Sequence, residues 1–135
     1  IMADNIRAAA ASGDVTRTAH ELAKIAGRYD AMASVAPENA DVLAHEVMSQ
    51  ELSYMAPEMA PKLDPKGKVI GQEWTGNYIQ KTATVRQAIE DWRPQGEFQD
   101  MRREYQSAAV AGASAAAAAT VANPAVMGPP STPTQ

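Results

Sequence analysis

Apolar side chains recur every three or four residues through most of residues 1–56, which is the spacing of one face of an α-helix. One such face lies within residues 15–33, and a second lies within residues 37–55. Asp14 is suited to cap the first helix, and Pro37 is suited to the first turn of the second. Since the link between them is short, the pattern predicts an antiparallel helical hairpin.

A series of prolines follows, with Pro57, Pro61 and Pro65 at intervals of four residues. Proline lacks a backbone N–H and clashes with the preceding helical turn, so a helix cannot run comfortably through this series. We therefore expect residues 57–71 to form an extended, proline-rich connector, with a turn at residues 64–67.

Residues 72–92 return to a helical spacing, with larger side chains on one stripe. The members of this stripe are Trp74, Tyr78, Thr82, Val85, Ile89 and Trp92. Since the strand signal of the chain is limited to a short run at residues 69–71, the pattern predicts an all-α fold. In this fold the N-terminal helical hairpin and the connector precede two further helices, within residues 72–122, and an extended C-terminal tail over residues 123–135.

The last predicted helix, over residues 97–122, is rich in alanine and carries a heptad pattern. Its stripe, which we name the seam, consists of Phe98, Met101, Tyr105, Ala108, Gly112, Ala115 and Ala119. The side chains of the seam shrink along the helix, and small side chains let helix backbones approach closely. The seam is therefore a predicted interface. The alternative is that the alanine content reflects helix propensity alone.

The distribution of charge sets this helix apart from the rest of the chain. No Asp, Glu, Lys or Arg follows Glu104, so residues 105–135 are uncharged. A free surface is rarely left without charge over such a length, so we expect a partner to cover this stretch. Residues 1–65 carry 5 basic and 10 acidic side chains, which disfavours contact with a nucleic-acid backbone.

Composition limits the size of the core that the chain can build. Aromatic residues make up 5% of the chain, and alanine, which buries little area, supplies much of the 45% apolar fraction. We expect two small cores separated by the connector, one around Leu22 and Leu43 and the other around Trp74 and Trp92. Such a chain would depend on an assembly for its stability.

Catalytic and cofactor-binding patterns are missing from the sequence. There is no cysteine, and His20 and His45 are each followed by a glutamate instead of standing in a metal-binding spacing. Adjacent side chains point about 100° apart on a helix, so neither His-Glu pair chelates a metal easily. No phosphate-binding loop, dinucleotide fingerprint or nucleophile elbow occurs. We predict a protein that is not an enzyme and holds no metal or cofactor.

These features predict a structural subunit of a multi-copy assembly, whose partners are copies of itself and other subunits. An internal, head-to-tail or ejection-type component of a bacteriophage virion fits the alanine-rich helix and the end rich in proline and threonine. A virion or a cytoplasmic assembly is the favoured location, since no signal peptide is seen. No small-molecule substrate is expected.

Two alternatives stay open. The first is a regulatory or nucleic-acid-binding module that reads DNA with residues 15–55. It would need a compensating basic face from Lys66, Lys68, Lys81, Arg86 and Arg93. The second is a membrane-active protein that uses residues 105–122, although this stretch is shorter and less apolar than a membrane span requires.

Overall fold

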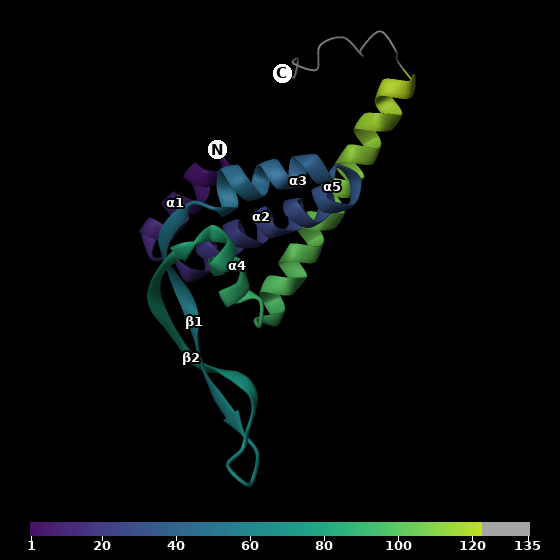
Figure 1. The fold of residues 1–135 in the computed structure, drawn as a ribbon. Coiled ribbons are helices and arrows are strands. Elements are labelled where there is room, and N and C mark those ends of the chain that lie inside the picture. The colour runs from purple at the N-terminus through teal and green to yellow at the C-terminus, as the bar shows by residue number, and fades with distance from the viewer. Residues whose placement is uncertain (123–135) are drawn as a thin grey trace.

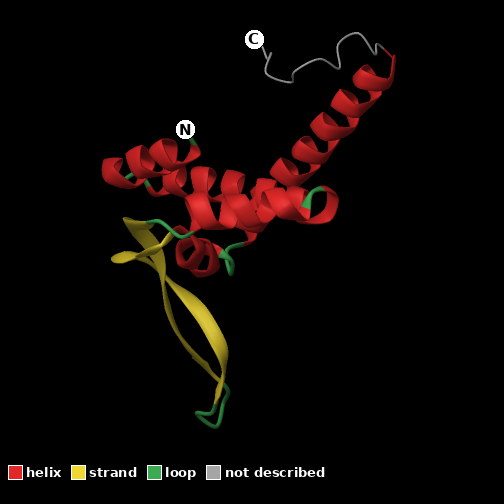
Figure 2. Ribbon diagram, turned by 45° about the horizontal axis from the view of Figure 1, so that its top comes forward, coloured by secondary structure: helices red, strands yellow, loops and turns green. Residues whose placement is uncertain are grey.

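The computed structural model describes the backbone of residues 1–122 and the side chains of residues 1–113. A long two-stranded hairpin projects from a body of helices (Figure 1, Figure 2). Along the chain lie α1 (Met2–Ser12), α2 (Val15–Val35), α3 (Pro37–Leu43), a wider π-type turn η1 (Ala44–Met48), β1 (Glu51–Leu63), β2 (Val69–Thr84), α4 (Val85–Trp92) and α5 (Gly96–Ala122). The fold is mixed α and β, so the prediction of an all-α protein is wrong.

The helices of the N-terminal half form where local sequence signals place them. The Asp14 carboxylate caps α2 by accepting a hydrogen bond from the backbone N–H of Arg17, at 3.1 Å. Pro37 lies in the first turn of α3. Gly13 ends α1 with a φ of 74°, a left-handed conformation that glycine adopts at no steric cost. The second predicted helix is cut short, because the chain leaves it through η1 and β1 begins at Glu51.

The hairpin replaces two elements that the pattern predicts. β1 and β2 pair antiparallel along their length, from Glu51 opposite Thr84 to Leu63 opposite Val69. They take up the predicted connector and most of the predicted helix over residues 72–92, of which only α4 is helical.

The proline-rich segment is extended, but it is part of a sheet instead of a connector. Pro57 and Pro61 both lie in β1, where each strand of a two-stranded sheet has one edge that needs no partner for its N–H groups. The turn expected at residues 64–67 is present. There the N–H of Gly67 donates to the carbonyl oxygen of Asp64 at 2.9 Å.

One hydrophobic core joins the helices to the base of the hairpin. α2 lies at its centre and contacts α1, α3, α4, α5 and β1. Leu22 and Ile25 of α2 pack in this core with Tyr54 of β1, Ile89 of α4 and Phe98 of α5, and each of these residues is at most 2% exposed. The expectation of two separate cores is wrong, because the hairpin brings β1 against α4.

Helix α5 crosses α2 (Figure 1), and the two helices approach closely at Gly27. A Cβ at Gly27 would lie 2.6 Å from the carbonyl oxygen of Arg102 and 2.6 Å from the Cβ of Tyr105, so the crossing requires glycine. Beside it, the Arg102 guanidinium donates two hydrogen bonds to the Asp30 carboxylate, at 2.7 and 3.0 Å. Past this crossing α5 runs on beyond the helical body.

Candidate protein-interaction site

The distal half of the hairpin, residues 59–74, reaches beyond the helices, and we name it the arm (Figure 2). It exposes large apolar side chains: Leu63 is 56% exposed, Val69 56%, Ile70 57% and Trp74 42%. Leu63 and Val69 are opposite each other in the pairing of the strands, so they form one apolar surface near the turn. Exposed apolar surface on a projecting element is typical of a binding site for another protein.

The edges of the arm offer a second means of binding. Within residues 1–122, β1 and β2 pair only with each other, so the outer edge of each strand has backbone groups without a strand partner. An open strand edge is a template for pairing with another chain. Since β1 contains Pro57 and Pro61 and β2 contains no proline, β2 has the complete set of backbone donors.

A bulge at the base of the arm redirects two aromatic side chains. Pairing passes from Pro57 opposite Tyr78 to Met59 opposite Trp74, so three residues of β2 face one residue of β1. In the middle of the bulge Gly76 has a φ of 93°, which favours glycine. In a regular strand, residues four apart are separated by about 13 Å. Here the ring centroids of Trp74 and Tyr78 are 5.5 Å apart. Bulges of this kind are common beside functional sites.

The redirected rings continue a row of aromatic side chains that reaches α5. Tyr78 stacks on Trp92 with centroids 5.7 Å apart, and Trp92 lies 6.4 Å from Phe98. This row lines a groove of about 490 Å³ between the hairpin, the start of α2 and the loop that leads into α5. The remaining residues that line the groove are Val15, Thr16, Ala19, Gln95, Gly96, Glu97 and Met101. We name it the aromatic groove.

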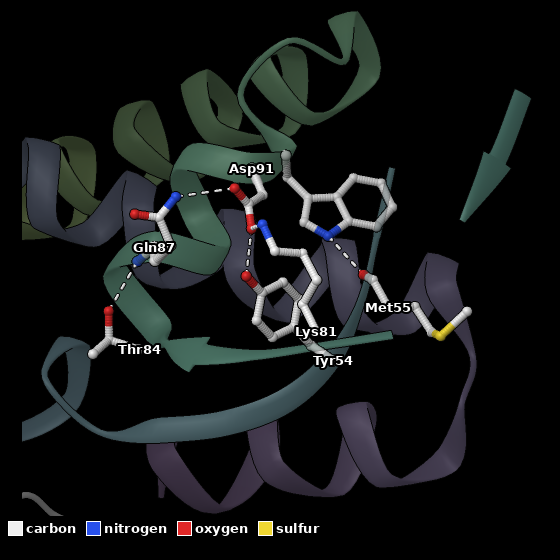
Figure 3. Close-up of polar contacts among 7 residues, drawn as sticks. Tyr54, Met55, Lys81, Thr84, Gln87 and Asp91 are labelled. Carbon is white, nitrogen blue, oxygen red and sulfur yellow. Dashed lines mark hydrogen bonds and ion pairs between the residues drawn. The ribbon is translucent and has the colours of Figure 1, made fainter. Parts of the chain in front are cut away.

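The indole N–H groups of the aromatic groove are already bonded within the fold. Trp74 donates through Nε1 to the carbonyl oxygen of Asn77 at 2.8 Å. Trp92 donates through Nε1 to the carbonyl oxygen of Met55 at 3.1 Å (Figure 3). The two indole N–H groups are therefore not free to donate to a ligand. Trp74 supplies most of the accessible indole surface, because it is 42% exposed and Trp92 is buried.

A polar cluster around Asp91 fastens the base of the hairpin to α4 (Figure 3). The Asp91 carboxylate accepts hydrogen bonds from the Tyr54 hydroxyl, from Lys81 Nζ at 2.8 Å and from Gln87 Nε2 at 3.0 Å. These donors come from β1, β2 and α4, so one carboxylate ties both strands to the helix. The backbone N–H of Gln87 also donates to the hydroxyl of Thr84, which caps α4.

The cluster shifts the titration of its two central groups in opposite directions. Burial, together with the hydrogen bond to Asp91 and its negative charge, raises the pKa of Tyr54. Burial also acts to raise the pKa of Asp91, but the hydrogen bonds from Lys81, Tyr54 and Gln87 outweigh it and hold that pKa below its usual value. At neutral pH the phenol is therefore a donor and the carboxylate an acceptor, so the cluster acts as a structural clamp.

The structure places the residues of the seam in different surroundings. Phe98 is buried in the core, and Met101 and Tyr105 pack partly buried against it. Ala108 and Gly112 are exposed on the part of α5 beyond the crossing. The side chains of the last two members, Ala115 and Ala119, lie outside the described residues. The seam thus starts as a contact within the chain, and its role between copies stays a prediction.

The described residues also bear on the metal, membrane and DNA sites that the sequence analysis considered. His20 Nδ1 lies 2.7 Å from the Tyr105 hydroxyl, and the structure gathers no group of three His, Asp or Glu side chains within metal-binding reach in the part it describes. None of the described helices has the length and hydropathy to cross a membrane. The second helix of the proposed DNA-reading unit ends early, since β1 takes over from Glu51.

The basic side chains proposed for nucleic-acid binding do not form one face. Lys66 and Lys68 lie exposed at the turn of the arm, and Arg86 is exposed on α4. Lys81 is bound to Asp91, and Arg93 pairs with Glu90 at 3.3 Å.

Comparisons of this chain with models of known protein families, with characterised proteins and with solved structures found no match. The narrower prediction of a bacteriophage virion component has no support in the fold or in the comparisons.

The helical pattern misses the aromatic groove because it places Trp74, Tyr78 and Trp92 on one stripe of one helix. The dipeptide Gly76-Asn77, set among threonine and aromatic residues, is the signal that indicates a bulge or turn instead.

Proposed function

We propose that this chain is a non-enzymatic subunit of a multi-copy assembly, and that its arm binds a neighbouring subunit, in the first place another copy of itself. The observation that carries this proposal is the arm, whose apolar side chains Leu63, Val69 and Ile70 are more than half exposed. A two-stranded hairpin alone is marginally stable in water, so a partner surface would add to its stability.

The base of the hairpin supports the same function. The Asp91 cluster and the core hold the hairpin against α4, so the direction of the arm is set before a partner binds. A preformed binding element loses less conformational entropy on binding than a mobile loop does. The complete edge of β2 suits strand addition, in which backbone hydrogen bonds supply affinity and alternate side chains supply specificity.

Exchange of Val69 and Ile70 for threonine is expected to reduce the mass of the native assembly. Both replacements keep a β-branched side chain, so the strand persists while its exposed apolar surface is lost. Loss of buried apolar contacts of this size weakens association by about tenfold or more. The measurement is the molar mass by sizing chromatography with light scattering, over a series of protein concentrations.

A matched control is available on the helices. Val35 is 58% exposed and Val42 57%, so threonine at both positions removes a similar exposed surface away from the arm. The control variant is expected to keep the mass of the unaltered protein. Equal masses for the arm variant, the control and the unaltered protein would reject the arm as the interface.

A second candidate function is nucleic-acid binding by the tip of the arm. Lys62, Lys66 and Lys68 are exposed around the turn, and Pro65 lies between them in the sequence. The Asp64 carboxylate accepts the backbone N–H groups of Lys66 and Lys68, both at 2.8 Å, which shapes the turn. Basic β-ribbons that carry an apolar wedge bind the minor groove of DNA.

This candidate predicts retention of duplex DNA that depends on salt. Glutamine at Lys66 and Lys68 is then expected to weaken binding and to lower the slope of log affinity against log salt by about 2, since each phosphate contact contributes about one unit. Fluorescence anisotropy of a labelled duplex at several salt concentrations measures it. Binding with the same salt slope in both proteins would exclude the tip.

A further inference from the structure

The aromatic groove has the chemistry of a site for an extended, proline-rich strand. Its row of rings has successive centroid separations of 5.5, 5.7 and 6.4 Å. Trp74 is 42% exposed and Tyr78 is partly exposed, whereas Trp92 and Phe98 are buried. Because the indole N–H of Trp74 is bonded within the fold, the exposed parts of the Trp74 and Tyr78 rings offer apolar surface, on which proline rings pack.

Polar groups around the rings suit the backbone of such a strand. A polyproline II strand makes no internal hydrogen bonds, so its carbonyl groups need donors. Thr16, Tyr78 and Gln95 line the groove, and the side chains of these residues donate no hydrogen bond to the side chains or backbone described over residues 1–113. Glu97 is the one charged residue among those that line the groove. A ligand without charged groups therefore needs no opposite charges from the groove.

We infer that the aromatic groove binds the segment from Pro124 to Pro133 of a second copy of this chain. The segment contains Pro124, Pro129, Pro130 and Pro133 and has no charged residue. This inference rests on the proposed function, because it names a second contact by which copies join.

Distance along the chain favours a segment from another copy. Along α5 the groove reaches as far as Met101, and α5 ends at Ala122, about 32 Å farther along at the rise of an α-helix. A polyproline II strand that starts at Ala122 reaches Pro130 after about 25 Å. Pro129 and Pro130 therefore fall short of the groove of their own chain, even if the strand turns straight back.

A contact of this kind joins different surfaces on the two copies. Heterologous contacts build closed rings or open chains, because every copy has both a free groove and a free segment. The two surfaces can therefore be disabled separately in the full-length chain. Trp74→Ala disables the groove, and serine at both Pro129 and Pro130 disables the segment.

The test measures molar mass for each variant and for their equimolar mixture. Each variant alone is expected to associate about tenfold or more weakly than the unaltered protein, since a central aromatic contact is lost. In the mixture one variant supplies the segment and the other the groove. Because the mixture has one kind of working segment and one kind of working groove, this contact can join only two copies. We therefore expect a species of twice the monomer mass. Tyr78→Phe, which keeps the ring, replaces Trp74→Ala if circular dichroism shows that the latter is unfolded.

Fluorescence gives an independent reading, because Trp74 and Trp92 are the only tryptophans of the chain and both line the groove. A synthetic peptide of residues 121–135, added to the full-length segment variant, is expected to change the tryptophan emission and to saturate. A matched peptide with alanine for all four prolines is expected to leave it unchanged. Equal responses to both peptides, or no response to either, would overturn the inference.

The result also separates this inference from the proposed function. If threonine at Val69 and Ile70 abolishes the assembly while the groove and segment variants keep its full mass, the inference fails and the arm remains the interface. If the groove variant and the segment variant each reduce the mass, their mixture restores a pair, and threonine at Val69 and Ile70 leaves the mass unchanged, the inference holds and the proposed role of the arm fails.

Discussion

Replacement of Gly27 by alanine is expected to lower the free energy of unfolding by roughly 2 kcal/mol, because overpacking of a tight contact typically costs about 1–3 kcal/mol. The new Cβ would meet two atoms of α5 at 2.6 Å, the carbonyl oxygen of Arg102 and the Cβ of Tyr105. Neither is the end of a flexible side chain, so α5 as a whole has to shift. Urea denaturation followed by circular dichroism measures the change.

Gly112 is the matched control for this prediction. It lies within α5, as Gly27 lies within α2, but a Cβ at Gly112 would have no atom within 4 Å beyond its own turn of the helix. Alanine at Gly112 is therefore expected to stabilise the protein by roughly 0.5–1 kcal/mol, the usual gain of alanine over glycine inside a helix. If alanine raises stability at both positions, the close crossing of α2 and α5 is incorrect.

Signals that act over a few residues made the N-terminal helices predictable. The Asp14 cap and Pro37 each fix the start of a helix through groups at most three residues away. Gly13 likewise ends α1 through its own backbone conformation. Such signals do not depend on the rest of the fold, so they can be recognised from the sequence alone.

The hairpin was missed because its pattern fits two structures. Trp74, Tyr78 and Thr82 are four residues apart, which suits one face of a helix and, as an even number, one face of a strand. The pairing that decides between them joins residues far apart in the sequence, such as Glu51 and Thr84. Periodicity within one segment does not report such pairing.

The close approach of α2 and α5 at Gly27 is a contact that the sequence analysis did not predict, and it leaves the predicted role of the seam between copies untested. The pattern of α5 directs attention to Gly112, whereas the backbone contact in the fold occurs at Gly27. Gly27 interrupts an otherwise strong helical pattern in α2, and an isolated glycine in such a position indicates a packing reason. The aromatic groove was less accessible to sequence reasoning, because the bulge at Gly76 and the start of α5 build it together.

Replacement of Asp91 by alanine is expected to destabilise the protein by about 2 kcal/mol, because a buried donor left without an acceptor costs about 1–3 kcal/mol. The donor is the hydroxyl of Tyr54, a residue with no exposed surface. Lys81 is 38% exposed, so its ion pair with Asp91 is screened by water and adds little. Thermal and urea denaturation measure the loss.

A neighbouring carboxylate and a double variant test the cause. Glu90 pairs with Arg93 on the exposed side of α4, so alanine at Glu90 is expected to change stability by less than about 0.5 kcal/mol. Phenylalanine at Tyr54 removes the orphaned donor, so the double variant with Asp91→Ala is expected to lose less than the two single variants together. Strict additivity would show that the Tyr54–Asp91 bond carries no stability.

The two pKa shifts of the cluster predict a loss of stability at both ends of the pH range. The pKa of Asp91 is lowered from 3.8, so its contribution is present above about pH 4 and is lost as pH falls through the pKa of the folded state. The pKa of Tyr54 is raised from 10.0, so its contribution is present below about pH 10 and is lost as pH rises above that value. The difference in unfolding free energy between the unaltered protein and Tyr54→Phe should therefore shrink above pH 10. Acid sensitivity should persist in Tyr54→Phe, because Lys81 and Gln87 still bind Asp91. A difference that stays constant from pH 9 to pH 11 would contradict the raised pKa of Tyr54 in the folded protein.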